Sequence, residues 1–307
     1  MKAVRLDDYN TAPVIRDIAT PEIGPEDVLV RVGAAALNPL DIKLQSGVLQ
    51  GYFPLEFRYT VGSDLAGMIE EVGANVSGWQ KGDKVIARLD PVAGGALAGF
   101  ACVPANYLVK VPEDMPLEVA AGIPTAAGTA WQALFELGGL GVGQTVLIHA
   151  GAGGVGSFAI QFARASGARV IATASGDGIA IAQTLGADQV IDYRHADFAE
   201  MLSDIDLVID TIGGETQQKS FGVLRSGGRL LSLVAPPDEA LAHAHNVNAQ
   251  FVFHMSDGDR LARVVSAMTE NNVRVLIDRT VPLDQFADAF ARQSSGRARG
   301  KIIATVV

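Results

Sequence analysis

The pattern of apolar and polar positions divides the chain into two regions with different periods. From residue 1 to about 115, short apolar segments such as 27–32 and 66–72 are separated by glycine and proline. Short segments bounded by turn formers are typical of strands, and they predict a compact barrel or sandwich. From about residue 117, helical patterns alternate with short apolar runs, which predicts a parallel, doubly wound sheet.

Individual elements follow from the same periods. In the first region a turn at Gly82-Asp83 leads into a strand, and another strand is expected between the prolines at 104 and 112. The last region carries an amphipathic helix at about 260–271 and an apolar run at 301–307, which we expect to return to the first domain. In the middle region the expected helices are 117–121, 129–135, 179–185, 198–202 and 216–224, and the expected strands are 146–148, 169–174, 189–192, 206–210, 229–234 and 250–253.

The stretch 146–175 has the length and order of one strand–helix–strand unit around a glycine turn. Its turn, residues 151–156, reads GAGGVG and fits G-x-G-x-x-G. Such glycines allow a tight turn, a close approach of backbone N–H groups to a pyrophosphate, and close packing of the helix. The helix N-terminus adds unpaired donors and a positive dipole end. The turn therefore predicts a dinucleotide site at Gly151, Gly153, Gly154, Val155 and Gly156.

Composition narrows the classes of function. The 307 residues are 49% hydrophobic, which suffices for two domains with sizeable cores, and the net charge of -10 argues against a nucleic-acid binder. The single cysteine, Cys102, excludes a disulfide framework or a multi-cysteine zinc site within one chain and suits a reducing compartment. The N-terminus lacks the apolar core of a signal peptide, and no apolar run is long enough to span a membrane. We expect a cytoplasmic protein without a membrane partner.

Short motifs in a fixed order add a family resemblance. The chain resembles the zinc-independent, quinone-oxidoreductase-like branch of the medium-chain dehydrogenase/reductases, of which zeta-crystallin is one type. The resemblance implies a GroES-like β-barrel domain from residues 1–117 and 262–307, an inserted Rossmann domain at 118–261, a cofactor in the cleft between them, and a homodimer. The motifs are Asn38-Pro39-Leu40-Asp41, 62–67 (GSDLAG), 82–85 (GDKV), 150–156 (AGAGGVG), 185–188 (LGAD), 190–193 (VIDY) and 299–301 (RGK).

The resemblance also bears on zinc. Zinc-dependent relatives carry a cysteine where Asn38 stands and a His-Glu pair where Ser63 and Asp64 stand. Asn38 and Ser63 are poor replacements for thiolate and imidazole ligands. His243 and His245 form an isolated pair that is better explained as loop residues than as ligands. We expect no metal.

The end of the second strand determines the choice of cofactor. An acidic residue there would bond the ribose 2′-hydroxyl of NAD, but the chain has Thr-Ala-Ser at 173–175. The neutral hydroxyl of Ser175 accommodates a 2′-phosphate, and by resemblance Tyr193 is a second contact. Asp177 stands where relatives usually carry a lysine nearby, and it would oppose the phosphate if it pointed there. We expect NADPH.

The nicotinamide end is assigned by resemblance. Thr125 matches a threonine beside the nicotinamide, Leu233 and Val234 match a stretch that bonds the carboxamide, and Phe251 and Phe253 match a wall of the pocket. Each has an ordinary alternative, since Thr125 suits a helix cap and the other four suit strand packing.

Three further residues complete the expected cofactor contacts. Thr211 follows the strand that ends at Asp210. Arg299 and Lys301 resemble the basic end of the last family motif, and they either contact the cofactor or cover the surface.

Without a metal to polarise an alcohol, the consistent chemistry is hydride transfer from NADPH to a quinone or to the β-carbon of an enone. Asn38 is the best candidate for a polar group beside the nicotinamide, with a turn before Pro39 as its alternative. Asp41 orients the loop, and Lys43 replaces a tyrosine found near substrate in some relatives. Tyr52 and Tyr59 are candidate proton donors or lid packing.

Two rival functions remain open at this stage. One is an NADPH-dependent alkenal or enoyl reductase that uses the same hydride step. The other is a crystallin-like or RNA-binding protein that binds NADPH without turnover, whose RNA version the acidic composition disfavours.

Overall fold

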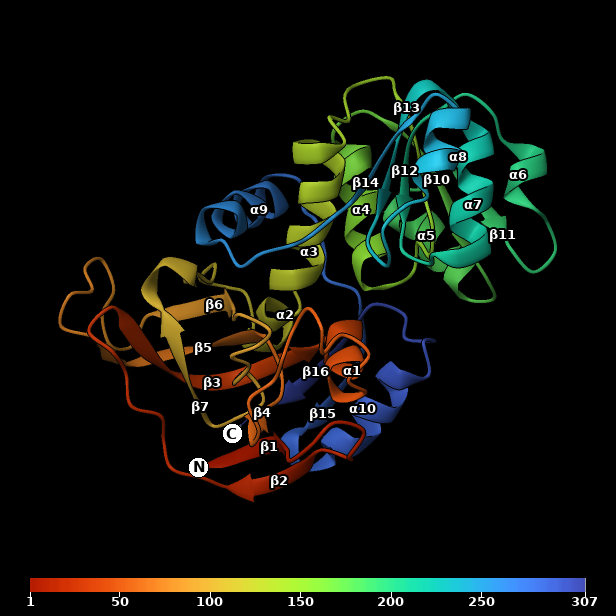
Figure 1. Cartoon of the computed structure of the whole chain (residues 1–307). Coiled ribbons are helices and arrows are strands. Elements are labelled where there is room, and N and C mark those ends of the chain that lie inside the picture. The colour runs from red at the N-terminus through yellow and green to blue at the C-terminus, as the bar shows by residue number, and fades with distance from the viewer. Residues whose placement is uncertain (307) are drawn as a thin grey trace. The chain divides into compact units, whose positions relative to one another are not determined.

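The computed structural model describes residues 1–306 and divides them into two compact units (Figure 1). The first unit contains Met1–Thr125, Met255–Ser266 and the chain from Ile277 onward, and the second contains Ala126–His254 and Ala267–Leu276. These boundaries differ from the expected 117/118 and 261/262. Thr125 stays with the first unit because its N–H bonds Asp64, and 267–276 joins the second because Gln161 bonds both backbone groups of Arg274.

Most strands of the first unit pair antiparallel, and the last two, β15 (Ile277–Pro282) and β16 (Lys301–Thr305), pair in parallel. β16 also pairs with β3 (Asp27–Leu37), where Ile302 lies opposite Leu37, so the tail returns to this unit as expected. The core is mostly aliphatic, with Tyr59 and Phe286 among its buried residues. The main sheet has the order β15 (Ile277–Pro282), β16 (Lys301–Thr305), β3 (Asp27–Leu37), β5 (Asp64–Val72), β6 (Lys84–Arg88), β8 (Val109–Lys110), with β7 (Phe100–Pro104) on β3; a second has the order β2 (Val14–Asp17), β1 (Lys2–Leu6), β4 (Tyr59–Thr60).

The prediction of a strand between Pro104 and Pro112 is mostly wrong. A 3-10 turn, Ala105–Tyr107, follows Pro104, and only Val109–Lys110 pairs as a strand. The Leu108 N–H closes the turn on the carbonyl of Ala105, which buries the Leu108 side chain in the core. The alternating pattern therefore reflects one turn and a short strand.

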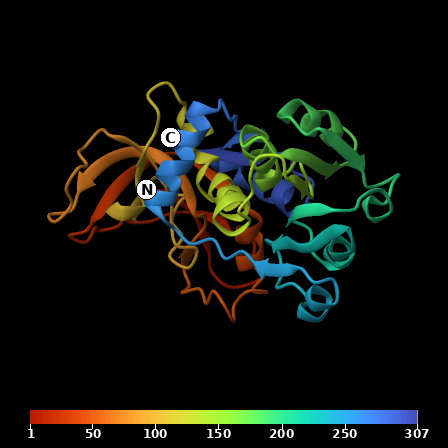
Figure 2. The ribbon, with the colours of Figure 1, turned by 90° about the horizontal axis from the view of Figure 1, so that it is seen from above.

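The second unit is a parallel sheet with helices on both faces, as its alternating pattern predicts. The helices α4 (Gly154–Ala165) and α5 (Gly178–Leu185) contact one half of the sheet, and α7 (Gly214–Val223) and α8 (Glu239–Ala244) contact the other. Figure 2 shows α5 in green and α7 in blue-green on opposite sides of the strands. The strand order is β11 (Gln189–Asp192), β10 (Arg169–Ala174), β9 (Thr145–Ile148), β12 (Ile205–Asp210), β13 (Leu224–Ser232), β14 (Asn248–Phe251).

The helix expected at 129–135 differs in form. An α-helix, α3 (Pro124–Trp131), changes to a π-helical turn at Gln132–Leu137. The change begins at Gln132, whose buried side chain donates to the carbonyl of Phe253 and bonds the His254 ring. The wider π-helical turn thus starts at Gln132, whose side chain bonds the residues that follow β14.

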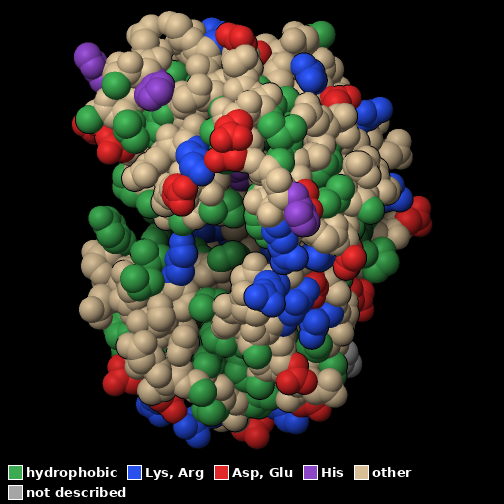
Figure 3. Space-filling model, turned by 90° about the vertical axis from the view of Figure 1, so that its right-hand side faces the viewer, with side chains coloured by type: hydrophobic (Ala, Val, Ile, Leu, Met, Phe, Trp, Pro, Cys, Tyr) green, Lys and Arg blue, Asp and Glu red, His purple; other side chains and the backbone are tan. Residues whose placement is uncertain are grey.

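The remaining helices vary in length from four to 13 residues. They are α1 (Pro39–Gln45), α2 (Leu117–Ala121), α6 (Phe198–Met201), α9 (Gly258–Glu270) and α10 (Phe286–Ser294). Within residues 1–306 no helix is both long and apolar enough to cross a bilayer. On the face drawn in Figure 3, Lys and Arg side chains gather in one area although the chain is acidic overall.

Candidate functional site

The glycine turn lies between β9 and α4, at the carboxyl end of the central strand. Its left-handed residue is Ala150, with φ 50°, rather than a glycine. A Cβ on Gly151 would lie 2.8 Å from the Cβ of Ala172, and one on Gly156 would overlap the carbonyl oxygen of Ala150. These two glycines are required because the helix packs closely on the turn and the strand.

Gly153 is less tightly packed than Gly151 and Gly156, and its backbone angles do not require a glycine. Its φ of -81° and ψ of -179° are open to any residue. An added Cβ would find only two atoms within 4 Å, the nearest being the Ala150 oxygen at 3.2 Å. This distance is a close contact, but no other residue lies within 4 Å, and a glycine so placed at the N-terminus of a helix fits the close approach of a phosphate group.

A buried histidine directly before the glycine turn helps to hold it in place, and it was not predicted from the sequence. His149 bonds the hydroxyl of Thr173 at 3.1 Å and that of Ser220 at 2.9 Å. Thr173 also accepts the N–H of Ala150, and its carbonyl accepts the N–H of Gly151. Burial lowers the pKa of His149 to about 4 against the opposing effect of Asp210, so the ring is a neutral bridge at neutral pH. Its position directly before the turn is the signal that could have identified it.

The expected cofactor contacts of the second unit follow the carboxyl ends of its strands. Ser175 after β10 donates to the hydroxyl of Tyr193 after β11 at 2.9 Å. Thr211 after β12 donates to the carbonyl of His149, and the Leu233 N–H bonds the carbonyl of Asp210. Because parallel strands end at one edge, these residues share the edge that carries the glycine turn.

Three other residues lie near strand ends at that edge. Phe251 is the last residue of β14. Val234 and Phe253 were expected at the ends of strands, but β13 ends at Ser232 and β14 at Phe251, so both residues follow their strands. Phe253 is 51% exposed, so ordinary strand packing does not account for its position. Asp177 is an exposed residue at the start of α5.

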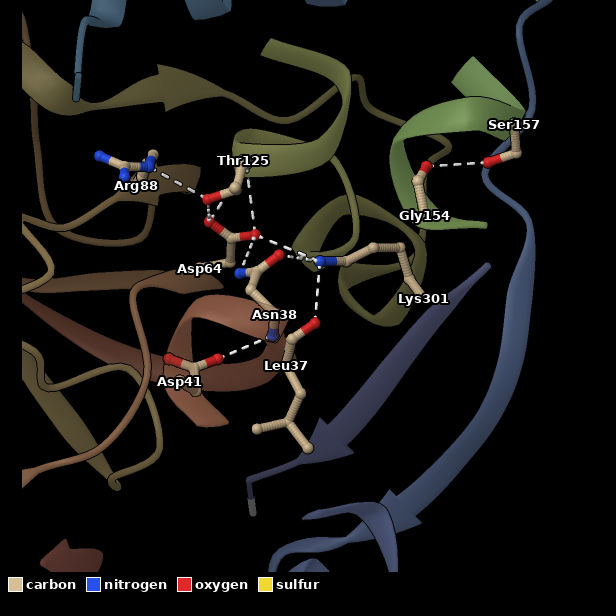
Figure 4. Close-up of polar contacts among 9 residues, drawn as sticks. All are labelled: Leu37, Asn38, Asp41, Asp64, Arg88, Thr125, Gly154, Ser157 and Lys301. Atoms are coloured by element: carbon tan, nitrogen blue, oxygen red, sulfur yellow. Dashed lines mark hydrogen bonds and ion pairs between the residues drawn. The ribbon is translucent and has the colours of Figure 1, made fainter. Parts of the chain in front are cut away.

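A second group of polar residues is buried in the first unit (Figure 4). Asn38 Nδ2 donates to Asp64 Oδ2 at 3.0 Å, while Lys301 Nζ donates to Asn38 Oδ1 at 2.6 Å and to the Leu37 carbonyl at 3.0 Å. Lys301 Nζ is also 3.5 Å from Asp64 Oδ2. Lys301 is 3% exposed, so the alternative that it covers the surface is wrong. Burial lowers the pKa of Lys301, against the raising effects of Asp64 and Asp41.

Thr125 also belongs to this group. The expected alternative was that Thr125 caps a helix, but the carboxylate of Asp64 instead caps the helix that contains Thr125. Its N–H lies 3.2 Å from both oxygens of Asp64, and its hydroxyl donates to Asp64 Oδ1 at 2.6 Å. The carboxylate on β5 thus supplies the acceptor for the first turn of α3. The Thr125 hydroxyl also accepts from Arg88 Nε at 3.1 Å.

Sequence reasoning missed Arg88 and Ser256 entirely. Arg88 ends β6 directly opposite Asp64 on β5, so the two side chains leave the same face of the sheet. Arg88 Nη1 donates to the hydroxyl of Ser256 at 2.9 Å. A charged residue directly after the apolar run 85–87 was the available signal.

The other catalytic candidates stay predictions, and they lie outside this group. Lys43 lies in the last turn of α1, and Tyr52 is 82% exposed. Tyr59 is buried, its hydroxyl donates to the Pro91 carbonyl, and burial raises its pKa. The backbone N–H of Arg299 bonds Asp278. Of the five catalytic candidates, the structure brings together Asn38 and Asp41.

Asp41 is fully enclosed beside this group. Its Oδ2 accepts the N–H of Asn38 at 2.7 Å, which orders the start of α1. Burial raises its pKa to about 7, with Asp64 raising it further and the Asn38 bond, Lys301 and Arg88 lowering it. Asp41 is therefore close to half protonated at neutral pH.

This raised pKa makes stability depend on pH. Between its ordinary pKa of 3.8 and about 7, folded Asp41 keeps a proton that the unfolded chain has lost. Its contribution is fully present below pH 3.8 and is lost as pH rises, by at most about 1.4 kcal/mol per unit. Asp41→Asn stays neutral, so its unfolding free energy relative to the wild type should rise from pH 4 to 7 and then level off. Urea unfolding across that range measures the difference, and a constant difference would contradict the expectation.

Comparison with known proteins agrees with both units. A family model described as "Alcohol dehydrogenase GroES-like domain" matches residues 24–113, and one described as "Zinc-binding dehydrogenase" matches residues 185–303. The mitochondrial NAD(P)H oxidoreductase RTN4IP1 of Mus musculus is 32% identical over 100% of this chain and 89% of its own length. The 2-methylene-furan-3-one reductase of Solanum lycopersicum is 32% identical over 99% of this chain and 78% of its own length.

Solved structures of other proteins have the same fold along nearly the whole chain. The quinone oxidoreductase from Coxiella burnetii has a TM-score of 0.92 at 30% identity and covers 100% of this chain and 99% of its own. The mycobacterial Rv1454c, solved in complex with NADPH, has a TM-score of 0.89 at 26% identity and covers 99% of each chain.

Proposed function

The chain belongs to the medium-chain dehydrogenase/reductase family, in its quinone-oxidoreductase-like branch, and we propose that it transfers hydride from NADPH to a conjugated carbonyl acceptor without a metal. The chain is an oxidoreductase with an NAD(P)H-type cofactor. The glycine turn at the N-terminus of α4 is the observation that carries the proposal, because at Gly153 an added Cβ would meet only the Ala150 residue, and the helix N-terminus there suits a bound phosphate. When bound, the cofactor supplies the hydride, and the protein binds and orients.

The buried group in the first unit does not suit a zinc ion. Asn38 Oδ1, which occupies the place of a metal-binding thiolate in zinc-dependent relatives, faces the ammonium of Lys301 at 2.6 Å. A divalent cation at that oxygen would lie against a positive charge. Residues 1–306 contain no cluster of three His, Cys, Asp or Glu side chains that could hold a metal ion. We therefore propose no metal-dependent step.

Preference for NADPH over NADH rests on Ser175 and Tyr193. Their hydroxyls lie 2.9 Å apart at the ends of neighbouring strands and offer neutral donors to a 2′-phosphate. We expect NADPH to bind at least about tenfold more tightly than NADH. Ser175→Asp should remove this preference by like-charge repulsion and should leave NADH binding in place. Fluorescence titration of both cofactors measures this, and tighter NADH binding by the wild type would contradict it.

The acceptor class is tested by turnover. We propose a quinone as the acceptor, and the enone named for the tomato relative makes an alkenal or enoyl reductase the second candidate. NADPH oxidation is measured with a panel of quinones and enones, and the larger kcat/KM identifies the class. Tight NADPH binding without turnover of any acceptor would favour the non-catalytic binding protein.

We also propose a homodimer in the cytoplasm. The single cysteine, Cys102, suits a reducing compartment. Light scattering should give twice the chain mass of 32.1 kDa, and the mass of one chain would exclude the dimer.

A further inference from the structure

Arg88 is a buried cation with unused hydrogen-bond donors. Its side chain is 6% exposed, and two of its nitrogens bond hydroxyls, Nε that of Thr125 and Nη1 that of Ser256. A guanidinium has five N–H groups in one plane, so these two bonds leave one N–H of Nη1 and both N–H groups of Nη2. Within residues 1–306, Nη2 forms no hydrogen bond.

Nη2 is not completely enclosed by the protein. Across the described chain, every side-chain nitrogen or oxygen that is fully buried has a hydrogen-bond partner. Nη2 has none, so it is not fully buried although the rest of the side chain is. In Figure 4 the two terminal nitrogens of Arg88 point away from Asp64 and Thr125. The accessible part of Nη2 therefore offers donors that Thr125 and Ser256 hold in place.

The surroundings favour a negatively charged oxygen there. Arg88 and Lys301 face the Asp64 carboxylate and the Asp41 carboxyl, whose pKa is raised to about 7 by burial. Asp64 is already occupied by Asn38, Thr125 and Lys301, so none of its bonds goes to Arg88. Burial lowers the pKa of Arg88, and Asp64, Asp90 and Asp41 raise it. A ligand oxyanion at Nη2 would replace water at a cation that has lost most of its hydration.

We propose that Arg88 Nη2 binds the carbonyl oxygen of the acceptor and stabilises the negative charge that develops on it. This inference rests on the proposed reductase function. In that reaction the acceptor gains the hydride with its two electrons, and the π electrons of the conjugated carbonyl move onto oxygen. The resulting enolate or hydroquinone anion then takes a proton from water, and NADP⁺ is the other product. The donors at Nη2 are fixed in place before reaction by Thr125 and Ser256, as electrostatic stabilisation requires.

Binding of p-nitrophenol without cofactor tests the site directly, because its phenolate resembles the product oxyanion and absorbs distinctly. The wild type should bind the phenolate more tightly than the phenol, which lowers the pKa of the bound probe. Arg88→Gln should weaken phenolate binding about tenfold or more and abolish the pKa shift. Arg88→Lys should recover part of both, because it keeps the charge and loses the fixed geometry. Arg31→Gln is the matched control on β3, where the side chain is 53% exposed, and it should behave as the wild type.

The outcomes separate this inference from the proposed function. Equal phenolate affinity in the wild type and Arg88→Gln, or no preference of the wild type for phenolate, overturns the role of Arg88. Turnover of a quinone or enone in that case would leave the reductase function standing. If no quinone or enone is reduced but the pKa of bound p-nitrophenol still shifts in a way that depends on Arg88, the proposed function is overturned and the oxyanion site remains. NADPH titration and urea unfolding establish that Arg88→Gln is folded.

Discussion

Gly153→Val is expected to abolish NADPH binding while leaving the protein folded. The backbone at Gly153 lies in a region open to valine, and the first added atom would find the Ala150 oxygen at 3.2 Å as its nearest neighbour. The side chain would instead occupy the space in front of the helix N-terminus, where we place the pyrophosphate. Overlap of this kind costs about 3 kcal/mol or more, so affinity should fall by at least about 100-fold.

Gly222→Val is the matched control for this substitution. Gly222 lies in α7 of the same unit, is exposed, and has no atom within 4 Å of an added Cβ. Fluorescence titration with NADPH should give wild-type affinity for Gly222→Val, and urea unfolding should show both variants folded. Wild-type affinity in Gly153→Val would remove the glycine turn as the phosphate site. Gly156 is less informative, because substitution there also disturbs the contact of α4 with the turn.

The fold was largely predictable because its signals are local. The turn at 151–156, the apolar run before it and the helix after it lie within one strand–helix–strand unit, and all three take the expected form. Errors occur where a distant side chain decides the local geometry. Gln132 begins a π-helical turn because it bonds Phe253 and His254, which lie more than a hundred positions away.

The candidate site was predictable only in part. Asn38, Thr125 and Lys301 were expected or considered as residues near the cofactor, and Asp41 was expected to orient its loop, but the contacts among the four were not predicted. Lys301 and Asn38 lie 263 positions apart and meet only because β16 pairs with β3. No periodic pattern marks which charged residue will be buried, and Arg88 was missed because it looks like any polar strand end.

Lys301→Met should destabilise the first unit strongly. The substitution keeps the length of the side chain but removes the three bonds that Nζ makes, to the Leu37 carbonyl, Asn38 and Asp64. The Asp64 carboxylate, which is 0% exposed, would lose its ammonium neighbour and could not regain water. Removing one partner from a buried ion pair costs about 3–5 kcal/mol, so the urea midpoint should fall well below that of the wild type.

The reason for this cost can be tested with a second substitution. In Lys301→Met with Asp64→Asn, the residue at 64 is neutral and still accepts from Thr125, so most of the lost stability should return. Lys81→Met supplies the same change at an exposed ion pair with Glu70, and it should alter unfolding little. A double variant as unstable as Lys301→Met alone would mean that the lost hydrogen bonds, rather than the uncompensated carboxylate, determine the effect. A Lys301→Met protein as stable as Lys81→Met would show that the Asn38, Asp64 and Lys301 contacts do not hold the first unit together.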